Sequence, residues 1–298
     1  MPVSRRDVVI SGAGITGLAL AASARSGPAL PLDLTDPEVA LSAYVRLRGS
    51  TARETVFQAY EGDIFLVADG QAAVPALGFK GIQKSRWRPH PDGGYANDDY
   101  DVGVYVDYRT REVLERWDNP LTEKSVEVFH YRGGPSGGHF RVGAESDDVY
   151  SDLAGRWTVV GDQLWHTSSI WGERPNQLQP DEWPLASSGE MFIGSMSTSF
   201  AGRVDDLRNP EISQAPALQI WTNIVSWMPW MEMGQRPGFN YWRWVGAKGV
   251  SRDALDPDLV ATVEAIWPGY VSEDAVWQQP TSGRLDYTRI KRGQPLTD

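Results

Sequence analysis

The chain has 298 residues, a net charge of −11 and no cysteine. The acidic balance disfavours binding to nucleic acids and to anionic lipid surfaces, and the lack of cysteine excludes disulfides, thiolate catalysis and cysteine-ligated metals. Thirteen Trp, 30 Gly and 20 Pro favour many short strands and turns over long helices. The composition therefore predicts a globular, mainly β protein that does not bind nucleic acid.

A GxGxxG pattern at Gly12, Gly14 and Gly17 is similar to the phosphate-binding loop of dinucleotide-binding domains. Such a loop works only between a strand and a helix of a βαβ unit. Here Gly27 and Pro28 break the second strand, and no βαβ alternation follows. We therefore predict no flavin or nicotinamide cofactor, and the remaining sequence predicts no other cofactor.

The same segment has the features of a twin-arginine export signal. Arg5 and Arg6 precede a mildly apolar stretch, which ends in an A-x-A cleavage site at Ala22-Ser23-Ala24. Its many small residues make it a poor permanent membrane anchor, although an uncleaved anchor is a further alternative. We therefore expect a signal peptide at residues 1–24, the twin-arginine translocase as a partner during export, and a periplasmic or secreted mature protein.

The mature chain is expected to form one domain. We divide it into a linker at residues 25–35, a single globular β-rich domain at 36–290 and a tail at 291–298. Asp36-Pro37 is a helix N-cap followed by Pro at the first helical position, and helical spacing continues to Gly49. A second helix follows Asp256-Pro257 and stops at Pro268.

Between these helices, short β-prone runs are separated by turn residues. The expected strands lie at residues 56–67, 102–107, 125–131, 157–166, 191–200, 218–227 and 239–245. Runs at this spacing predict an antiparallel barrel or sandwich, of lipocalin or calycin type, with two or three peripheral helices; an α+β fold is the alternative. The glycine-rich residues 133–138 are expected to form a flexible surface loop or a lid.

Two histidines are candidate acid–base residues. His130 alternates with Val126 and Val128, so it points inward if the valines face the interior. His166 shares a strand face with Leu164 in the same way. An imidazole in a pocket can act as general acid or base near neutral pH, whereas a buried histidine that is only hydrogen-bonded in the core is the structural alternative.

Carboxylates that are two residues apart on a strand are further candidates. Glu61 and Asp63 could form an acid–base pair with separated pKa values, and the alternative is a solvated strand end. Tyr105 and Asp107 repeat this spacing. The acidic residues 97–101 lack the spacing of a calcium loop, so we expect a solvated turn there.

The densest cluster of aromatic residues and methionines lies at residues 227–238. Two tryptophans and three methionines surround a single carboxylate, Glu232, in the pattern of an adaptable apolar pocket wall; they are Trp227, Met228, Trp230, Met231 and Met233. Arg236 lies four residues after Glu232, so a structural ion pair is the alternative. No metal motif and no G-x-S-x-G elbow occurs, so we predict no metal; a dispersed site made by His130, His166 and Glu190 is the exception to consider.

Several segments together resemble the family of bacterial and fungal proteins catalogued as domain of unknown function number 1838. They are residues 44–49, 117–122 with 126–128, 184–190 and, above all, 227–238, which contains Pro-Trp-Met-Glu-Met-Gly. After His130 the family tends to continue with an Asn-Asp-Pro-like segment, whereas this chain continues into the glycine-rich residues 133–138. The resemblance implies a single globular domain that is frequently exported, and it implies no catalytic residue.

Our leading hypothesis is an exported, cofactor-independent enzyme that transfers protons on an apolar, aromatic or terpenoid molecule, as a lyase, isomerase or hydratase does. The expected catalytic residues are His130 as base and Glu232 or Glu190 as acid, with His166 as a further candidate. The expected substrate-binding residues are Arg46, Arg48, Trp165, Trp227, Trp230, Tyr241 and Trp242. The alternatives are a lipocalin-like carrier of an apolar ligand and a metal-dependent oxygenase or hydrolase.

Overall fold

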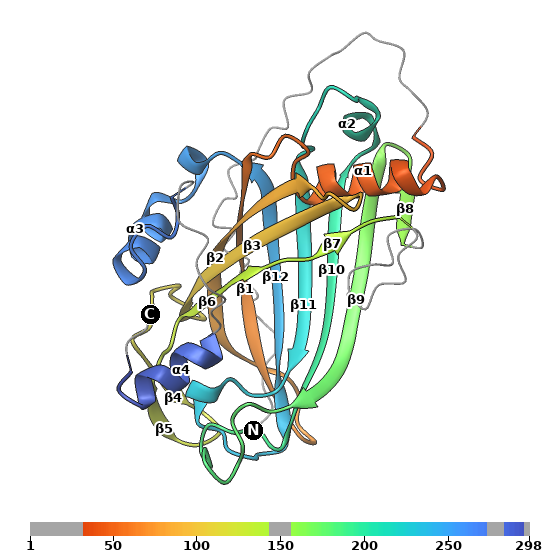
Figure 1. Ribbon diagram of the computed structural model, residues 1–298. Helices are drawn as coiled ribbons and strands as arrows, with labels where there is room; N and C mark the ends of the chain where they lie inside the picture. Colours follow the sequence, from red (N-terminus) through yellow and green to blue (C-terminus); the bar gives the residue numbers. More distant parts are fainter. Residues whose placement is uncertain (1–31, 143–155, 273–282, 295–298) are drawn as a thin grey trace, which may run out of the picture.

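The computed structural model describes residues 32–142, 156–272 and 283–294 (Figure 1). The expected signal peptide at 1–24, residues 25–31 of the expected linker and residues 295–298 of the expected tail lie outside the described residues. The assignment of these segments, and with it the domain division, stays a prediction. In the described part of the chain, no helix combines the length and apolar character that crossing a bilayer requires.

A single antiparallel sheet of ten strands dominates the structure. Its strands follow the order β6-β3-β2-β1-β12-β11-β10-β9-β8, and β7 also pairs with β3. The bounds are β1 (Thr55–Ala68), β2 (Val74–Pro89), β3 (Tyr95–Asp107), β6 (Tyr131–Ser136), β7 (His139–Phe140), β8 (Trp157–Val160), β9 (Gln163–Pro175), β10 (Met191–Arg203), β11 (Ala217–Val225) and β12 (Gly238–Val250). A separate hairpin pairs β4 (Arg116–Asn119) with β5 (Lys124–Glu127).

The sheet is strongly bent but open. Figure 1 shows β2, β3 and β6 running across β10, β11 and β12, so the sheet folds over its own inner face. The two ends of the strand order, β6 and β8, do not pair with each other in the described residues. The prediction of a mainly β fold is therefore confirmed, and a closed barrel is not formed.

The two predicted helices are present. The side chain of Asp36 accepts hydrogen bonds from the backbone N–H groups of Glu38 and Val39 and caps α1 (Pro37–Arg48). Asp256 caps α3 (Pro257–Ile266) in the same way. The described residues also contain α2 (Val204–Arg208), α4 (Gly283–Lys291) and the short 3-10 helices η1 (Pro229–Met231) and η2 (Arg252–Ala254), so the number of helices was underestimated.

Helix α1 lies across one end of the bent sheet. Its Leu41, Tyr44 and Val45 pack on Trp87 of β2 and on Phe140 of β7, while Ala43 and Leu47 pack on β9 and β10. The buried ammonium group of Lys248 donates to the carbonyl oxygens of Arg46, Gly49 and Ala215 at 2.7–2.9 Å. The C-terminal end of α1 is thus fixed to the middle of the sheet.

Several strand predictions need correction. Strands β4 and β7 were not predicted, and β3 was predicted only for residues 102–107. Strand β2 was missed, because Gly78, Gly81 and its lysines interrupt the apolar alternation. The run at 125–131 is divided between β5 and β6, and the run at 157–166 contains the turn between β8 and β9. Of the glycine-rich residues 133–138, which were predicted to form a loop or a lid, residues 133–136 belong to β6, and this strand pairs with β3.

Candidate functional site

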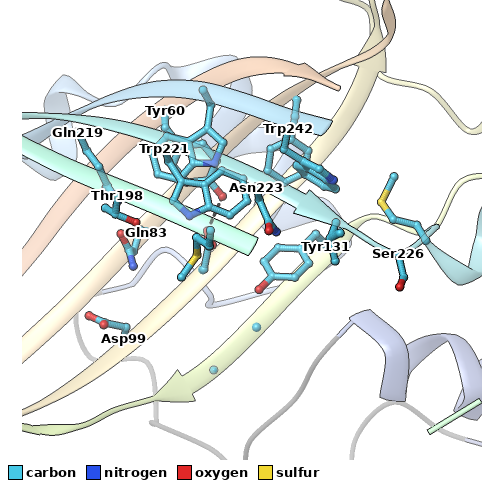
Figure 2. A pocket seen from close by; sticks show the side chains of 18 of the residues that line it. Tyr60, Gln83, Asp99, Tyr131, Thr198, Gln219, Trp221, Asn223, Ser226 and Trp242 are labelled. Atoms are coloured by element: carbon cyan, nitrogen blue, oxygen red, sulfur yellow. Dashed lines mark hydrogen bonds between the residues drawn. The ribbon is translucent and has the colours of Figure 1, made fainter. Parts of the chain in front are cut away.

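The bent sheet encloses a cavity of about 660 Å³ on its inner face. Figure 2 shows polar side chains at one side of this cavity and aromatic rings beside them. The aromatic side chains that line it are Tyr60, Phe79, Tyr105, Phe129, Tyr131, Phe140, Phe192, Trp221, Trp227, Trp230, Trp242 and Trp244. A volume of this size matches the usual range for small-molecule sites.

The aromatic wall is a continuous stack of rings across neighbouring strands. Tyr60 stacks on Trp244 with 4.3 Å between ring centroids, and Trp244 stacks on Trp221 at 5.2 Å. The register explains this arrangement, since Trp221 and Trp244 lie directly opposite each other on β11 and β12. Rings held in this way lose little freedom when a ligand binds, so the wall is a preorganised apolar surface.

Glycines on the neighbouring strands make space for these aromatic rings. Tyr60 and Gly81 are direct partners on β1 and β2, and a Cβ at Gly81 would lie 2.2 Å from the phenol ring and its oxygen. Phe79 lies over Gly103 of β3 in the same manner. Gly81, one of the glycines that obscured β2 in the sequence, therefore makes space for Tyr60 in the wall, and Gly103 of β3 makes space for Phe79.

We expect Gly81→Ala to displace the Tyr60 ring and to lower the free energy of unfolding by about 1–3 kcal/mol, the usual cost of overpacking. Gly172→Ala is the matched control, because Gly172 is also a strand glycine and nothing lies within 4 Å of an added Cβ there. Urea unfolding measures both variants. Equal stability of the two would contradict the close packing of Tyr60 on Gly81.

A pair of aspartates lies at the polar side of the cavity. Asp99 and Asp101 are two residues apart on β3, so their side chains share the inner face. The hydroxyl of Tyr60 donates a short hydrogen bond to Asp101. Asp99 accepts from the side-chain amide of Asn97 at 2.7 Å and lies 3.4 Å from the guanidinium of Arg48.

Both carboxyls titrate close to neutral pH. Burial raises the pKa of Asp101 to about 7, with a further contribution from the charge of Asp99 and an opposing one from the Tyr60 hydrogen bond. Burial raises the pKa of Asp99 to about 6, against the lowering effects of Arg48 and Asn97. A carboxyl with a pKa near 7 can both give and take a proton at physiological pH, which is the requirement for general acid–base catalysis.

Two indole N–H groups in the wall, those of Trp230 and Trp242, have no acceptor among the described residues. The indole N–H of Trp242 is buried and has no hydrogen-bond partner among the described residues. Buried donors usually find a partner, and Trp242 lines the cavity. An oxygen atom of a bound molecule would satisfy this N–H.

The structure brings together only part of the predicted binding residues. Arg48, Trp227, Trp230 and Trp242 line the cavity. Arg46 is buried elsewhere and donates to the carbonyl oxygens of Leu207 and Asn209 at 2.7 and 2.8 Å. The side chains of Trp165 and Tyr241 lie on the outer face of the sheet, because their strand positions have the opposite parity to the lining residues.

The four predicted catalytic residues do not line the cavity. The Nδ1 atom of His130 accepts the backbone N–H of Tyr105 at 3.2 Å, and burial lowers the pKa of His130 to about 4, so the ring is neutral at pH 7. His166 is buried between the rings of Tyr44 and Trp157.

Glu232 is half-buried at the end of η1 in a left-handed conformation, with φ 51° and ψ 42°. Glu190 is exposed just before β10. Within the described ranges, no group of three or more His, Asp or Glu side chains is arranged to hold a metal.

The acidic pair escaped the sequence analysis because residues 97–101 have the composition of a turn. The alternation of Asp99 and Asp101 with Tyr100 and Val102 was the available signal. The two other proposed pairs are accounted for by local contacts. Asp63 binds Arg111 at 2.9 Å on the outer face, and Asp107 accepts backbone N–H groups of the following turn.

A bent, open antiparallel sheet with an aromatic cavity and a buried carboxyl pair defines a β-rich protein with a cavity of small-molecule size. The chain belongs to the family described as Protein of unknown function (DUF1838), whose model matches residues 53–289. This match confirms the resemblance found in the sequence. No curated protein matches the chain.

Proposed function

We propose that the protein is an enzyme that transfers protons on a small, largely apolar molecule bound in this cavity, in the manner of a lyase, isomerase or hydratase. The observation that carries the proposal is the contact between Tyr60 and Asp101 at the edge of the aromatic wall. A carboxyl group with a pKa of about 7, which is close to physiological pH, thus lies beside an apolar surface that would hold a substrate and exclude water.

The proposal assigns a role to each group. Asp101 is the acid–base residue, and Tyr60 orients its carboxyl through the short hydrogen bond. The indole N–H of Trp242 donates to a substrate oxygen. Arg48 forms an ion pair with Asp99 and partly compensates its charge. The polar side of the cavity is therefore close to neutral overall, which favours an uncharged substrate.

Solvent hydrogen exchange tests this function without knowledge of the natural substrate. A panel of neutral aromatic and terpenoid ketones and alkenes is incubated with the protein in D₂O, and deuterium uptake at carbon is measured by mass spectrometry. We expect uptake with the unaltered protein and a loss of about 100-fold or more in Asp101→Asn. Asp63→Asn is the matched control, because Asp63 lies on the outer face and outside the cavity.

A carrier of an apolar ligand is the second candidate, and the predominance of aromatic rings in the lining favours it. Native mass spectrometry of protein from its own host distinguishes the two. A carrier retains a stoichiometric ligand and exchanges no hydrogen in the panel, whereas an enzyme exchanges hydrogen and is isolated empty.

We also propose that the protein acts in the periplasm or outside the cell after twin-arginine export. The support comes from Arg5-Arg6 and the A-x-A site at Ala22-Ser23-Ala24. Expression in a twin-arginine-competent bacterium should give a mature protein that begins at Arg25, and Arg5→Lys/Arg6→Lys should abolish this processing. Intact-mass measurement checks both; a purified protein that keeps Gly12 would contradict the proposal.

A further inference from the structure

The outer face of β9 to β12 carries exposed apolar side chains. On β11 they alternate with the cavity-lining residues, so they point away from the cavity. Trp171 is 74% exposed, although it is the largest side chain of the group. We name this surface the open face; its members are Trp171, Ile193, Leu218, Ile220, Ile224 and Val245.

The strand register makes these residues one contiguous surface. Ile220 lies directly opposite Val245 of β12 and Ser199 of β10. Ile224 lies opposite Ser195, which in turn lies opposite Trp171 of β9. Exposed apolar surfaces that extend over several strands are uncommon on monomeric proteins and usually mark interaction sites.

The polar residues within the open face are largely satisfied by each other. The hydroxyls of Thr167 and Ser199 form a hydrogen bond of 2.7 Å, and Ser169 donates to Ser197 at 3.3 Å. These four hydroxyl groups therefore keep a partner when water is removed from this surface, which lowers the free-energy cost of their desolvation.

We infer that the open face is the interface of a homodimer, in which two sheets pack face to face. The face extends over the four strands β9 to β12, roughly 20 Å at the usual strand spacing, and about 30 Å along the strands. These lengths give a flat area of roughly 600 Å². The surface of the protruding side chains adds to it, so the face approaches the roughly 800 Å² per partner of a standard interface. An acidic chain with net charge −11 is repelled by an anionic membrane, which disfavours lipid as the occupant.

The charges on the open face also fit a second copy of the chain. Arg243 of β12 and Glu173 of β9 are exposed on the outer face, and neither forms an ion pair within the described residues. In a twofold interface, a contact of one residue with a second residue of the other copy recurs with the two copies exchanged. An ion pair of Arg243 with Glu173 of the other copy can therefore form twice in the same dimer, which gives the assembly a preferred register.

Sedimentation equilibrium of the full-length protein at micromolar concentrations tests the dimer. We expect a dimer whose dissociation constant rises about tenfold or more in Ile220→Lys. Ile266→Lys on α3 is the matched control, because Ile266 is similarly exposed but lies away from the open face. Arg243→Glu should weaken the dimer, and the double variant Arg243→Glu/Glu173→Arg should restore it.

Two results would overturn the inference. One is a monomer at all concentrations, including a monomer that co-sediments with phosphatidylcholine vesicles and so assigns the face to lipid. The other is a dimer that Ile220→Lys and Ile266→Lys affect equally. Near-ultraviolet circular dichroism, which reports fixed packing of the aromatic side chains, verifies that the variants are folded, and it keeps this test independent of the proposed enzymatic activity.

Discussion

Replacement of Asp101 by Asn is expected to stabilise the protein above pH 7 and to remove the proposed proton-transfer activity. Burial raises the pKa of Asp101 to about 7 in the folded state, from its ordinary value of 3.8. The stabilising contribution of the protonated carboxyl is therefore fully present below about pH 4 and is lost as the pH rises through 7. Asparagine is uncharged at every pH, as the protonated carboxyl is. Asp101→Asn is therefore expected to be more stable than the unaltered protein only at alkaline pH.

The expected size follows from about 1.4 kcal/mol for each pKa unit. Because part of the shift is shared with Asp99, we expect a gain of about 2 kcal/mol at pH 8 and almost none at pH 4. Urea unfolding at the two pH values measures the difference. The control Asp63→Asn loses an outer ion pair with Arg111 and should be slightly less stable at pH 8. A loss of stability in Asp101→Asn that is the same at both pH values would contradict the raised pKa.

The second large effect is a loss of stability, which we expect in Asp286→Ala. The guanidinium of Arg132 on β6 donates two hydrogen bonds to Asp286 on α4, at 2.6 and 3.1 Å, and both side chains are buried. Removing the carboxylate leaves the buried cation without its counter-ion, which costs about 3–5 kcal/mol. Denaturant unfolding followed by tryptophan fluorescence measures the loss.

Two controls show whether this loss comes from the stranded charge. Asp205→Ala breaks an exposed pair with Arg208 and should cost less than about 1 kcal/mol. The double variant Arg132→Met/Asp286→Leu removes both charges and should recover most of the stability lost in Asp286→Ala. If the double variant were as unstable as the single one, the packing of α4 rather than its ion pair would dominate.

Local sequence signals predicted the elements that depend on local interactions. The Asp-Pro caps located α1 and α3, and apolar alternation located β1, β10, β11 and β12. Helix α4 was missed, because its polar sequence is held by tertiary contacts such as the pair between Arg132 and Asp286. Strand β2 was missed for a similar reason, since Gly81 is explained only by the Tyr60 ring on β1 and Gly78 only by the side chains of Arg111 and Val106.

The open edge of the sheet was beyond prediction for a physical reason. Alternation shows which residues face inward, but closure depends on pairing between strands far apart in the sequence. Here α1 occupies one end of the bent sheet, and its Tyr44 contacts residues of β2, β7 and β9. In a barrel, pairing between the first and last strands closes the sheet. Here the packing of α1 on the sheet covers that end instead.

The candidate site was predicted in part. The aromatic residues Trp227, Trp230 and Trp242 stand out by their density in the sequence, and they do line the cavity. The acid–base group was sought among histidines and Glu232, which are conspicuous because they are rare or isolated. Asp101 acquires its properties from burial and from Tyr60, forty-one residues away, and no local pattern reports such a contact.

The most direct test of the central claim is the titration of the Asp101 carboxyl carbon by ¹³C nuclear magnetic resonance, with Asp101→Asn for assignment. It is performed with and without 1-anilinonaphthalene-8-sulfonate as a cavity ligand. Our account predicts a midpoint near 7 that moves when the cavity is occupied. A midpoint near 4 that does not respond to the ligand would show that Asp101 is an ordinary solvated carboxylate and would contradict the proposed site.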